Sequence, residues 1–223
     1  MLDPFCGSGT LLVEAGLLGR HAVGCDVDPV AVFASRVKTR PLTEKALVPN
    51  LNRLLTAFSA FERDKETYAR FTFDDLSSDS YAREAEGLSI PAIPNLFHWF
   101  RRYVVIDLAR MRVAIRSLEA PATHRAFFEL CFASIIRAAS NADPVPVSGL
   151  EVTSYMKQRD KDGRIVNPFA LFSQAARRAI RDMNSYSQKV DAGTRVSVLP
   201  RDATKIGPFR QRIDGVITSP PYH

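Results

Sequence analysis

Two short stretches of the sequence contain the residue types from which a ligand loop and a reactive turn could be built. In the first, a carboxylate, an aromatic side chain and two closely spaced glycines follow one another in the run Asp3-Pro4-Phe5-Cys6-Gly7-Ser8-Gly9-Thr10. Glycine adopts positive φ and has no Cβ, so backbone N–H groups of such a loop can approach a ligand. A helical apolar pattern follows directly, which is typical of a nucleotide-type loop, although Gly-Ser-Gly-Thr turns also occur as plain connectors.

The second stretch is the turn Ser219-Pro220-Pro221-Tyr222, which follows an apolar run over 213–218. Both prolines fix φ and lack an N–H, so a pocket at this turn would be faced by acceptors. A hydroxyl and an aromatic ring flank the prolines. Such a rigid polar-Pro-Pro-aromatic turn is rare by chance.

Two further acids follow apolar runs elsewhere in the chain. Asp26 ends the run Ala22-Val23-Gly24-Cys25, where a doubly wound fold places the carboxylate that binds a ribose hydroxyl pair. Asp202 comes just after an alternating run over 195–199. Asp3 and Asp202 could instead be loop caps, and Asp26 a surface acid. That all three follow predicted strands favours a ligand site.

The elements that must position these residues form one half of a nucleotide-binding α/β sheet. A short strand at Leu2 leads into the glycine loop. The spacing of apolar residues then predicts a helix over 10–18, ended by Gly19, where left-handed φ is tolerated. A buried strand follows over 21–26.

The next helix is expected to begin at Pro29, with Asp28 as its N-cap. Later strands are expected over 195–199 and 213–218. Right-handed crossovers then predict a parallel sheet in which the order is 195–199, 21–26, the Leu2 strand and 213–218. The glycine loop and the Ser219 turn should therefore lie on the same side of the sheet.

Three segments are expected: a cofactor-domain part over 1–42, a largely helical insertion over 43–190, and a catalytic part over 191–223. The polar stretch over 144–167 is expected to be a loop or a short hairpin. One predicted helix of the insertion is rich in arginine, which indicates either a DNA-contacting, phosphate-facing surface or a solvated basic face. Its arginines are Arg101, Arg102, Arg110, Arg112 and Arg116.

The composition is that of an ordinary soluble globular protein, with 223 residues, 46% hydrophobic and 24% charged. The net charge of +6 favours a polyanionic partner, and no apolar run is long enough to span a membrane. Cys6, Cys25 and Cys131 are scattered, which suits a reducing cytoplasm. The histidines have no metal-ligand spacing, so no metal site is expected.

With these residues in view, the chain resembles the S-adenosylmethionine-dependent DNA amino-methyltransferases, which act on cytosine N4 or adenine N6. The resemblance is carried by the run from Asp3 to Thr10, by Gly24-Cys25-Asp26, by Asp202 and by Thr218-Ser219-Pro220-Pro221-Tyr222. It implies a partial Rossmann-like parallel sheet with a long helical insertion. The order, with the glycine loop first and the Pro-Pro-Tyr turn last, is one that this family permits.

The resemblance also implies a role for each residue of the two stretches. The loop residues Phe5, Cys6, Gly7, Ser8, Gly9 and Thr10 would surround the methionine part of S-adenosylmethionine. Asp3 would lie near the cofactor's amino group, Asp26 would bind the ribose hydroxyls and Asp202 the adenine amine. In the turn, Ser219 and the Pro220 carbonyl would hydrogen-bond the target amine, Pro221 would rigidify the turn, and Tyr222 would stack on a base flipped from double-stranded DNA. The amine would then attack the methyl group directly.

The choice of substrate stays open at this point. Serine at the first turn position favours the cytosine amine over the adenine amine, and a Pro-Cys turn for ring-carbon methylation is absent from the sequence. A tRNA or rRNA guanine-N2 methyltransferase shares the loop and the turn. The chain could also be an inactive fragment that needs a complementary chain, with an exposed apolar edge over 213–218 that makes it poorly soluble alone.

Overall fold

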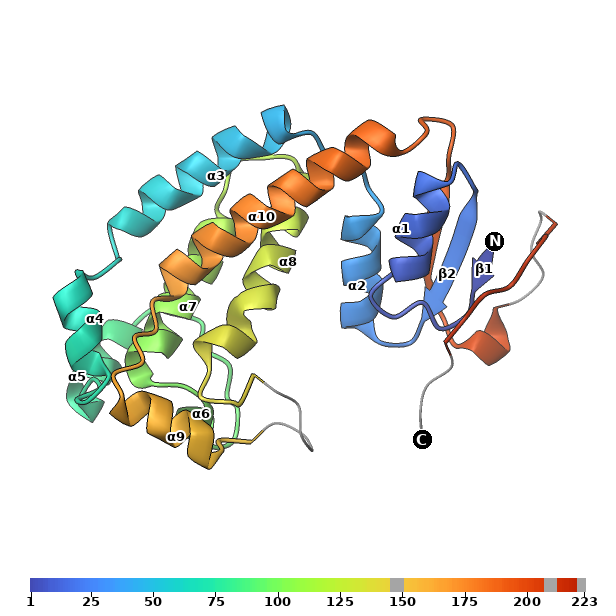
Figure 1. Cartoon of the computed structure of the whole chain (residues 1–223). Helices are drawn as coiled ribbons and strands as arrows, with labels where there is room; N and C mark the ends of the chain where they lie inside the picture. The colour runs from blue at the N-terminus through green and yellow to red at the C-terminus, as the bar shows by residue number, and fades with distance from the viewer. Residues whose placement is uncertain (145–150, 207–211, 220–223) are drawn as a thin grey trace. The chain divides into compact units, whose positions relative to one another are not determined.

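The computed structural model describes residues 1–144, 151–206 and 212–219. The chain forms two compact units (Figure 1). Unit 1 comprises Met1–Leu47 and Ile180–His223, and unit 2 comprises Val48–Ala179. The functional roles expected for 1–42, 43–190 and 191–223 stay predictions.

Unit 1 is built on a parallel sheet of three strands, β1 (Leu2–Asp3), β2 (Ala22–Asp26) and β3 (Val196–Pro200). β2 is central and pairs with β1 on one side and with β3 on the other (Figure 1). Val216 forms a parallel bridge with Leu2 on the outer side of β1. The predicted α/β class and the predicted spatial order of the four segments are confirmed.

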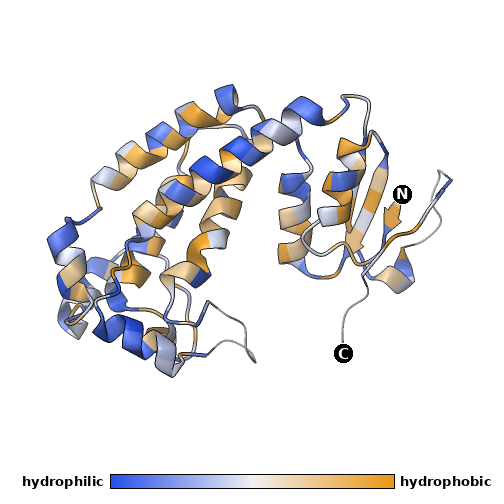
Figure 2. Cartoon of the chain, in the orientation of Figure 1, coloured by the Kyte–Doolittle hydropathy of each residue, from blue (hydrophilic) through white to orange (hydrophobic). Residues whose placement is uncertain are grey.

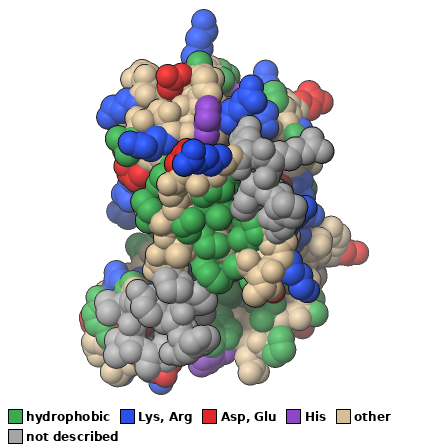
Figure 3. All heavy atoms as spheres, turned by 90° about the vertical axis from the view of Figure 1, so that its right-hand side faces the viewer, with side chains coloured by type: hydrophobic (Ala, Val, Ile, Leu, Met, Phe, Trp, Pro, Cys, Tyr) green, Lys and Arg blue, Asp and Glu red, His purple; other side chains and the backbone are tan. Residues whose placement is uncertain are grey.

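The strand predicted over 213–218 is wrong in its extent, because the structure has only the bridge at Val216. Leu2 N–H donates to the Gly215 carbonyl at 2.9 Å, and Ile217 N–H donates to the Leu2 carbonyl at 3.0 Å. β1 has two residues, so its outer edge offers few backbone groups for a longer ladder. Val216 and Ile217 are 58% and 52% exposed. Figure 3 looks onto this side of the molecule, where hydrophobic side chains gather.

Two helices, α1 (Thr10–Leu17) and α2 (Pro29–Lys38), contact the sheet. Their ends follow the predicted caps, since Gly19 has φ +66° and the Asp28 carboxylate accepts the Val30 N–H at 2.8 Å. Helix, sheet and loop residues share one small core. Its buried members are Cys6, Leu12, Ala15, Ala22, Val32 and Val198.

Gly24 in β2 allows α1 to pack closely on the sheet. A Cβ at this position would lie 2.6 Å from Leu12 Cδ1 and 2.9 Å from Cys6 Cβ. Both neighbours belong to the buried core, so neither can move aside easily. The approach of α1 and the glycine loop to β2 therefore depends on glycine at this position.

The secondary structure of unit 2, among its described residues, consists of helices without a strand. Its helices, of which the first and last continue into unit 1, are α3 (Glu44–Ser59), α4 (Lys65–Phe71), α5 (Ser78–Ala85), α6 (Leu96–Trp99), α7 (Arg102–Arg116), α8 (Ala122–Ala139), α9 (Ser154–Lys161) and α10 (Pro168–Lys189). Polar and apolar residues alternate along them at helical spacing (Figure 2). Phe58 and Phe172 meet edge to face with ring centroids 5.3 Å apart, and Phe128 is fully buried, as expected for core aromatics.

The loop or hairpin predicted over 144–167 is wrong for part of that range, because α9 (Ser154–Lys161) lies within it. The Thr153 hydroxyl caps this helix by accepting the Met156 N–H at 3.3 Å. Met156 is the buried residue of the helix. A helix anchored by one apolar side chain has no apolar periodicity from which it could be predicted.

Buried ion pairs connect the elements of unit 2. The Arg63 guanidinium contacts both the fully buried Asp107 and Glu84, and Arg110 also pairs with Glu84, at 3.2 Å. Arg101 pairs with Asp160 at 2.7 Å. Two of the arginines expected on a phosphate-facing surface, Arg101 and Arg110, are thus engaged inside the unit.

None of the helices in the described ranges is both long and apolar enough to cross a membrane.

Candidate functional site

The glycine loop between β1 and α1 has the backbone conformation that its glycines predict. Gly7 has φ +47° and Gly9 has φ +82°. Residues with a Cβ adopt this left-handed backbone region only at a cost in free energy. Gly9 is also close to α2, because a Cβ there would lie 2.7 Å from Ser35 Oγ and 3.0 Å from Ser35 Cα. Glycine is therefore required at residue 9 for both its φ and the space that it leaves.

Side chains from β2 and α2 hold the loop through hydrogen bonds to its backbone. The Gly7 N–H donates to Asp26 Oδ2 at 2.8 Å, and the Gly7 carbonyl accepts the Ser35 hydroxyl at 2.6 Å. Lys38 Nζ donates to the Ser8 carbonyl at 3.1 Å. The loop is thus fixed at several points before any ligand arrives, which lowers the entropic cost of binding.

The start of α1 adds hydrogen-bond donors to this loop. Gly9 occupies the N-cap position, and no side chain caps the helix. The first N–H groups of a helix have no partner within the helix, and with the helix dipole they favour a negatively charged or strongly polar ligand. Phe5, at the turn before the glycines, is 40% exposed and can cover an apolar part of a ligand.

Asp26 lies at the carboxyl end of β2 and is half-buried. Besides the Gly7 N–H, its carboxylate accepts the Asp28 N–H at 2.9 Å through Oδ1. Each carboxylate oxygen can accept more than one hydrogen bond. Asp26 therefore both shapes the loop and keeps acceptor capacity for a hydroxyl pair.

Asp3 joins the two stretches singled out in the sequence. Its carboxylate is buried, and Oδ1 accepts the Phe5 N–H at 3.2 Å and the Thr218 hydroxyl at 2.9 Å. Oδ2 accepts no hydrogen bond from the part of the chain that the structure describes. Thr218 immediately precedes Ser219, which is exposed. The beginning of the predicted reactive turn thus lies beside the glycine loop, on the predicted side of the sheet.

The other predicted turn residues, Pro220, Pro221 and Tyr222, lie outside the described residues.

Asp202 follows β3, at the same carboxyl edge of the sheet. Its Oδ1 accepts the Thr204 N–H and the Thr204 hydroxyl, each at 2.8 Å, and so caps the short 3₁₀ helix Ala203–Lys205. These hydrogen bonds hold the pKa of Asp202 below its ordinary value. The loop-cap interpretation of this residue therefore applies, while Oδ2 accepts nothing from the described residues.

The cysteines of the site are neutral thiols. Burial is the main cause that raises the pKa of both Cys6 and Cys25 above the ordinary thiol value. A thiolate is the nucleophilic form of cysteine, so neither residue is activated for attack at neutral pH. The arrangement suits a reaction that needs positioned acceptors and no covalent intermediate.

Sequence reasoning missed the supporting residues Ser35 and Lys38, and it gave no separate role to Thr218, the first residue of the stretch Thr218–Tyr222. Ser35 is a fully buried polar residue on a helix face whose other buried members are Val32, Ala34 and Val37. A serine among apolar residues on the inner face of α2 is a signal that could have been used. For Lys38 the sequence has no such signal.

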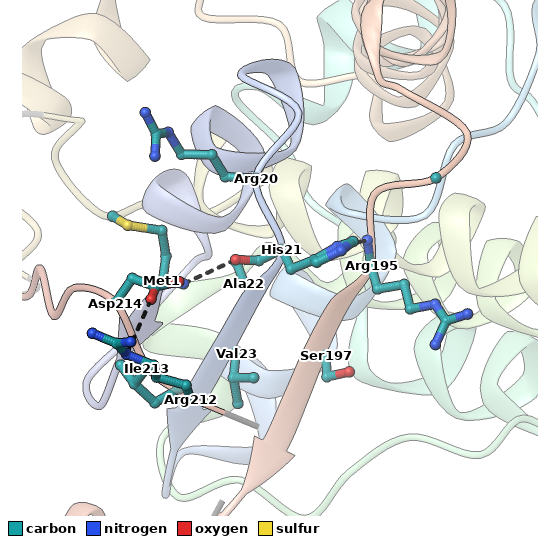
Figure 4. Close-up of a pocket in the computed structure, with 11 residues that line it drawn as sticks. Met1, Arg20, His21, Ala22, Val23, Arg195, Ser197, Arg212, Ile213 and Asp214 are labelled. Atoms are coloured by element: carbon teal, nitrogen blue, oxygen red, sulfur yellow. Dashed lines mark hydrogen bonds and ion pairs between the residues drawn. The ribbon is translucent and has the colours of Figure 1, made fainter. Parts of the chain in front are cut away.

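A cavity of about 760 Å³ lies at the opposite edge of the sheet (Figure 4). Met1, His21 and Arg195 line it at the amino ends of the strands, together with Arg212 and Asp214. The Met1 ammonium donates to the His21 carbonyl at 3.0 Å, and Arg212 and Asp214 are 3.7 Å apart. None of the predicted site residues that the structure describes lines this cavity. Ligands of open α/β sheets bind at the carboxyl ends of the strands, so we place the candidate site there.

Comparison with known proteins agrees with this geometry. Residues 1–67 match the family model described as the RMKL-like methyltransferase domain. The matched range contains the glycine loop, β2 with Asp26, and the α2 residues that support the loop. This part of the chain is thus similar to a methyltransferase domain.

Individual relatives have different names, and one of them gives a tRNA substrate. The chain is 25% identical over 141 residues to the type II methyltransferase M.MvaI of Kocuria varians, which is 63% of this chain and 28% of that protein. It is 61% identical over 28 residues to the tRNA (guanine(10)-N2)-dimethyltransferase of Methanocaldococcus jannaschii, which is 13% of this chain and 8% of that protein. The aligned stretches thus span less than a third of these relatives. No solved structure gave a significant match.

Proposed function

We propose that the protein is an S-adenosylmethionine-dependent methyltransferase that methylates an exocyclic amine, cytosine N4 or adenine N6, in double-stranded DNA. The observation that carries the proposal is the hydrogen bond from Thr218 to Asp3, at 2.9 Å. It places the beginning of the Ser219 turn beside the glycine loop. A methyl donor held by the loop and an amine held by the turn would then be neighbours.

The donor groups of the site fit S-adenosylmethionine. The uncapped N-terminus of α1 suits the cofactor's carboxylate, and the unused Oδ2 of Asp3 suits its ammonium group. Asp26 has acceptor capacity for the ribose hydroxyls, and Asp202 keeps Oδ2 for the adenine amine. When bound, the cofactor supplies an electrophilic methyl group on a sulfonium.

The chain's own residues would position the amine. Ser219 is exposed at the end of a segment that Thr218 ties to Asp3, so its hydroxyl can accept or donate a hydrogen bond at the edge of the loop. Pro220 and Pro221 offer carbonyl acceptors and no N–H, and the Tyr222 ring would stack on the base. The neutral thiols of Cys6 and Cys25 agree with direct transfer to the amine.

The choice of DNA rests on the extent of the similarity. The alignment with M.MvaI, a type II methyltransferase, covers 63% of the chain and therefore extends beyond the loop and β2. The tRNA guanine-N2 enzyme aligns with 13% of it, at higher identity. Methylation of a guanine amine in tRNA is thus the second candidate. A role in restriction–modification would accompany the first candidate, the DNA methyltransferase.

The relatives are much longer, so a further polypeptide segment or a partner chain would complete the enzyme. The apolar, half-exposed Val216 and Ile217 beside β1 suit pairing with such a segment.

A methyl-transfer assay with tritiated S-adenosylmethionine on double-stranded DNA and on tRNA tests the proposal. We expect label in DNA from a chain extended at both ends, and little from the 223 residues alone. Ser219→Ala should lower kcat and leave cofactor affinity nearly unchanged, because Ser219 is assigned to the base. Label in tRNA alone would support the second candidate. Label in neither, with cofactor bound, would contradict both.

A further inference from the structure

Unit 2 contains a cavity of about 260 Å³ that the proposed methyl transfer does not use. It lies between α7, α8 and the loop over residues 89–93. Most of its walls are apolar, with Ile90 from the loop, Leu108 from α7 and Phe132 from α8 among the lining residues. Arg112, on α7, is the one charged side chain among the described residues that line it.

The loop side of this cavity is preformed. Pro91 and Pro94 restrict the backbone on both sides of Ile93, and the Ile93 N–H donates to the Pro91 carbonyl at 3.0 Å. Asn95 then has φ +55°, and its carbonyl accepts the His98 N–H at 2.8 Å. A wall that is rigid before binding reduces the entropy that a ligand must overcome.

Arg112 differs from the other arginines that precede it on α7. Arg110 pairs with Glu84 at 3.2 Å, and the Arg102 guanidinium lies over the Phe97 ring, 5.0 Å from its centroid. Within the described ranges, the half-buried Arg112 guanidinium has no hydrogen bond, ion pair or ring contact. A guanidinium presents several N–H donors in a planar fork that matches a carboxylate. An anion on Arg112 would satisfy these donors.

We infer that this cavity binds a small amphipathic carboxylate, with its apolar body between α7, α8 and the 89–93 loop and its carboxylate on Arg112. A nucleobase is disfavoured, because Ser89 and Arg112 are the polar side chains among the described lining residues and the base edges would lose hydrogen bonds to water without replacement. A neutral hydrocarbon would occupy the apolar walls and leave the Arg112 charge without a counterion. The charge of Arg112 and the apolar walls of the cavity together favour a carboxylate with an apolar body.

Titration calorimetry of octanoate into the full 223-residue chain tests the inference. We expect octanoate to bind to the wild-type chain and to bind about 10-fold or more weakly to Arg112→Gln, which loses a charge-assisted pair. Arg116→Gln is the matched control, since Arg116 is exposed on the same helix and does not line the cavity. Octanol, which has the same chain and no charge, should bind equally to the wild type and Arg112→Gln.

A second variant tests the position of the apolar body. Ala109 lines the cavity from α7, and Ala109→Leu should fill it and abolish binding of both octanoate and octanol while the far-ultraviolet circular dichroism stays unchanged. Absence of octanoate binding to the wild type, equal affinity in Arg112→Gln, or retained affinity in a folded Ala109→Leu would overturn the inference. If Ala109→Leu does not fold, Arg112→Gln against Arg116→Gln decides. None of these readouts depends on methyl transfer.

Discussion

Carboxylates in the two units of the molecule have different partners. In unit 1, Asp3 and Asp26 accept hydrogen bonds from backbone N–H groups and a hydroxyl, and neither forms an ion pair with a described residue. In unit 2, Asp107 and Glu84 contact the Arg63 guanidinium. Neutral donors leave the charge of an acid available to a ligand, whereas an arginine neutralises it. The same residue type thus carries no paired cation at Asp3 and Asp26 and is an internal crosslink at Asp107 and Glu84.

The largest expected effect comes from breaking the crosslink. Arg63→Met would leave the fully buried Asp107 without its cation, and losing one partner of a buried pair costs about 3–5 kcal/mol. Urea unfolding at pH 8 measures this loss. Arg212→Gln is the control, because the Arg212–Asp214 pair is exposed and such pairs contribute about 0–1 kcal/mol. Equal effects of the two substitutions would contradict the difference between the units.

The pH dependence of Arg63→Met sharpens the same point. Burial, opposed by Arg63, already raises the pKa of Asp107 to about 6, above its ordinary value of 3.8. Without Arg63 that pKa rises further. Between the unfolded and folded pKa values the folded state binds the proton more tightly, so stability falls as pH increases through this window and is regained as pH decreases. We expect the stability lost in Arg63→Met at pH 8 to shrink at pH 5. A loss independent of pH would mean that Asp107 is not its source.

The corresponding test in unit 1 is Asp26→Ala. In an extended chain that binds S-adenosylmethionine, the substitution should weaken binding by about 1–3 kcal/mol, because charge-assisted hydrogen bonds to the ribose and the support of Gly7 are lost together. Calorimetry compares it with Asp28→Asn, which keeps an acceptor at the α2 N-cap. An unchanged affinity for S-adenosylmethionine in Asp26→Ala would show that Asp26 does not bind the cofactor.

The smallest expected effect concerns Ser35, which supports the loop and contacts no ligand in the proposal. Ser35→Ala removes the hydroxyl that donates to the Gly7 carbonyl at 2.6 Å and should cost about 1 kcal/mol of stability. Thermal unfolding would detect the shift, and cofactor affinity would fall only slightly. A large loss of affinity at unchanged stability would instead give Ser35 a direct ligand role.

Local features of unit 1 were predictable because their causes lie within a few residues. Asp28 caps α2 and Gly19 ends α1 through short-range geometry, and the strand order follows from the handedness of the crossovers. Asp3 and Asp26 are predicted to lie at the ends of strands, and they are the last residues of β1 and β2. Their assignment to particular cofactor atoms stays a prediction.

The rest depends on contacts between distant residues. The Ser35 hydroxyl meets Gly7 across 28 positions, and Arg63 meets Asp107 across 44. No spacing rule relates such pairs, so the arginine-rich helix α7 could not be divided in advance into paired and unpaired members. The short pairing of the 212–219 segment likewise follows from the two-residue length of β1.

The bond between Thr218 and Asp3 has a consequence for the order in which the sheet assembles. It joins residues 215 positions apart, a loop that becomes much shorter once β1, β2 and β3 have paired, so this contact is expected to form after β2 has paired with β3. The segment is held to β1 by the backbone hydrogen bonds of Leu2 and Ile217 and by this side-chain bond. Such an edge opens at a small fraction of the global unfolding free energy. In hydrogen exchange the Ile217 amide should therefore exchange long before those of β2, and Thr218 would be released from Asp3 while the glycine loop stays folded.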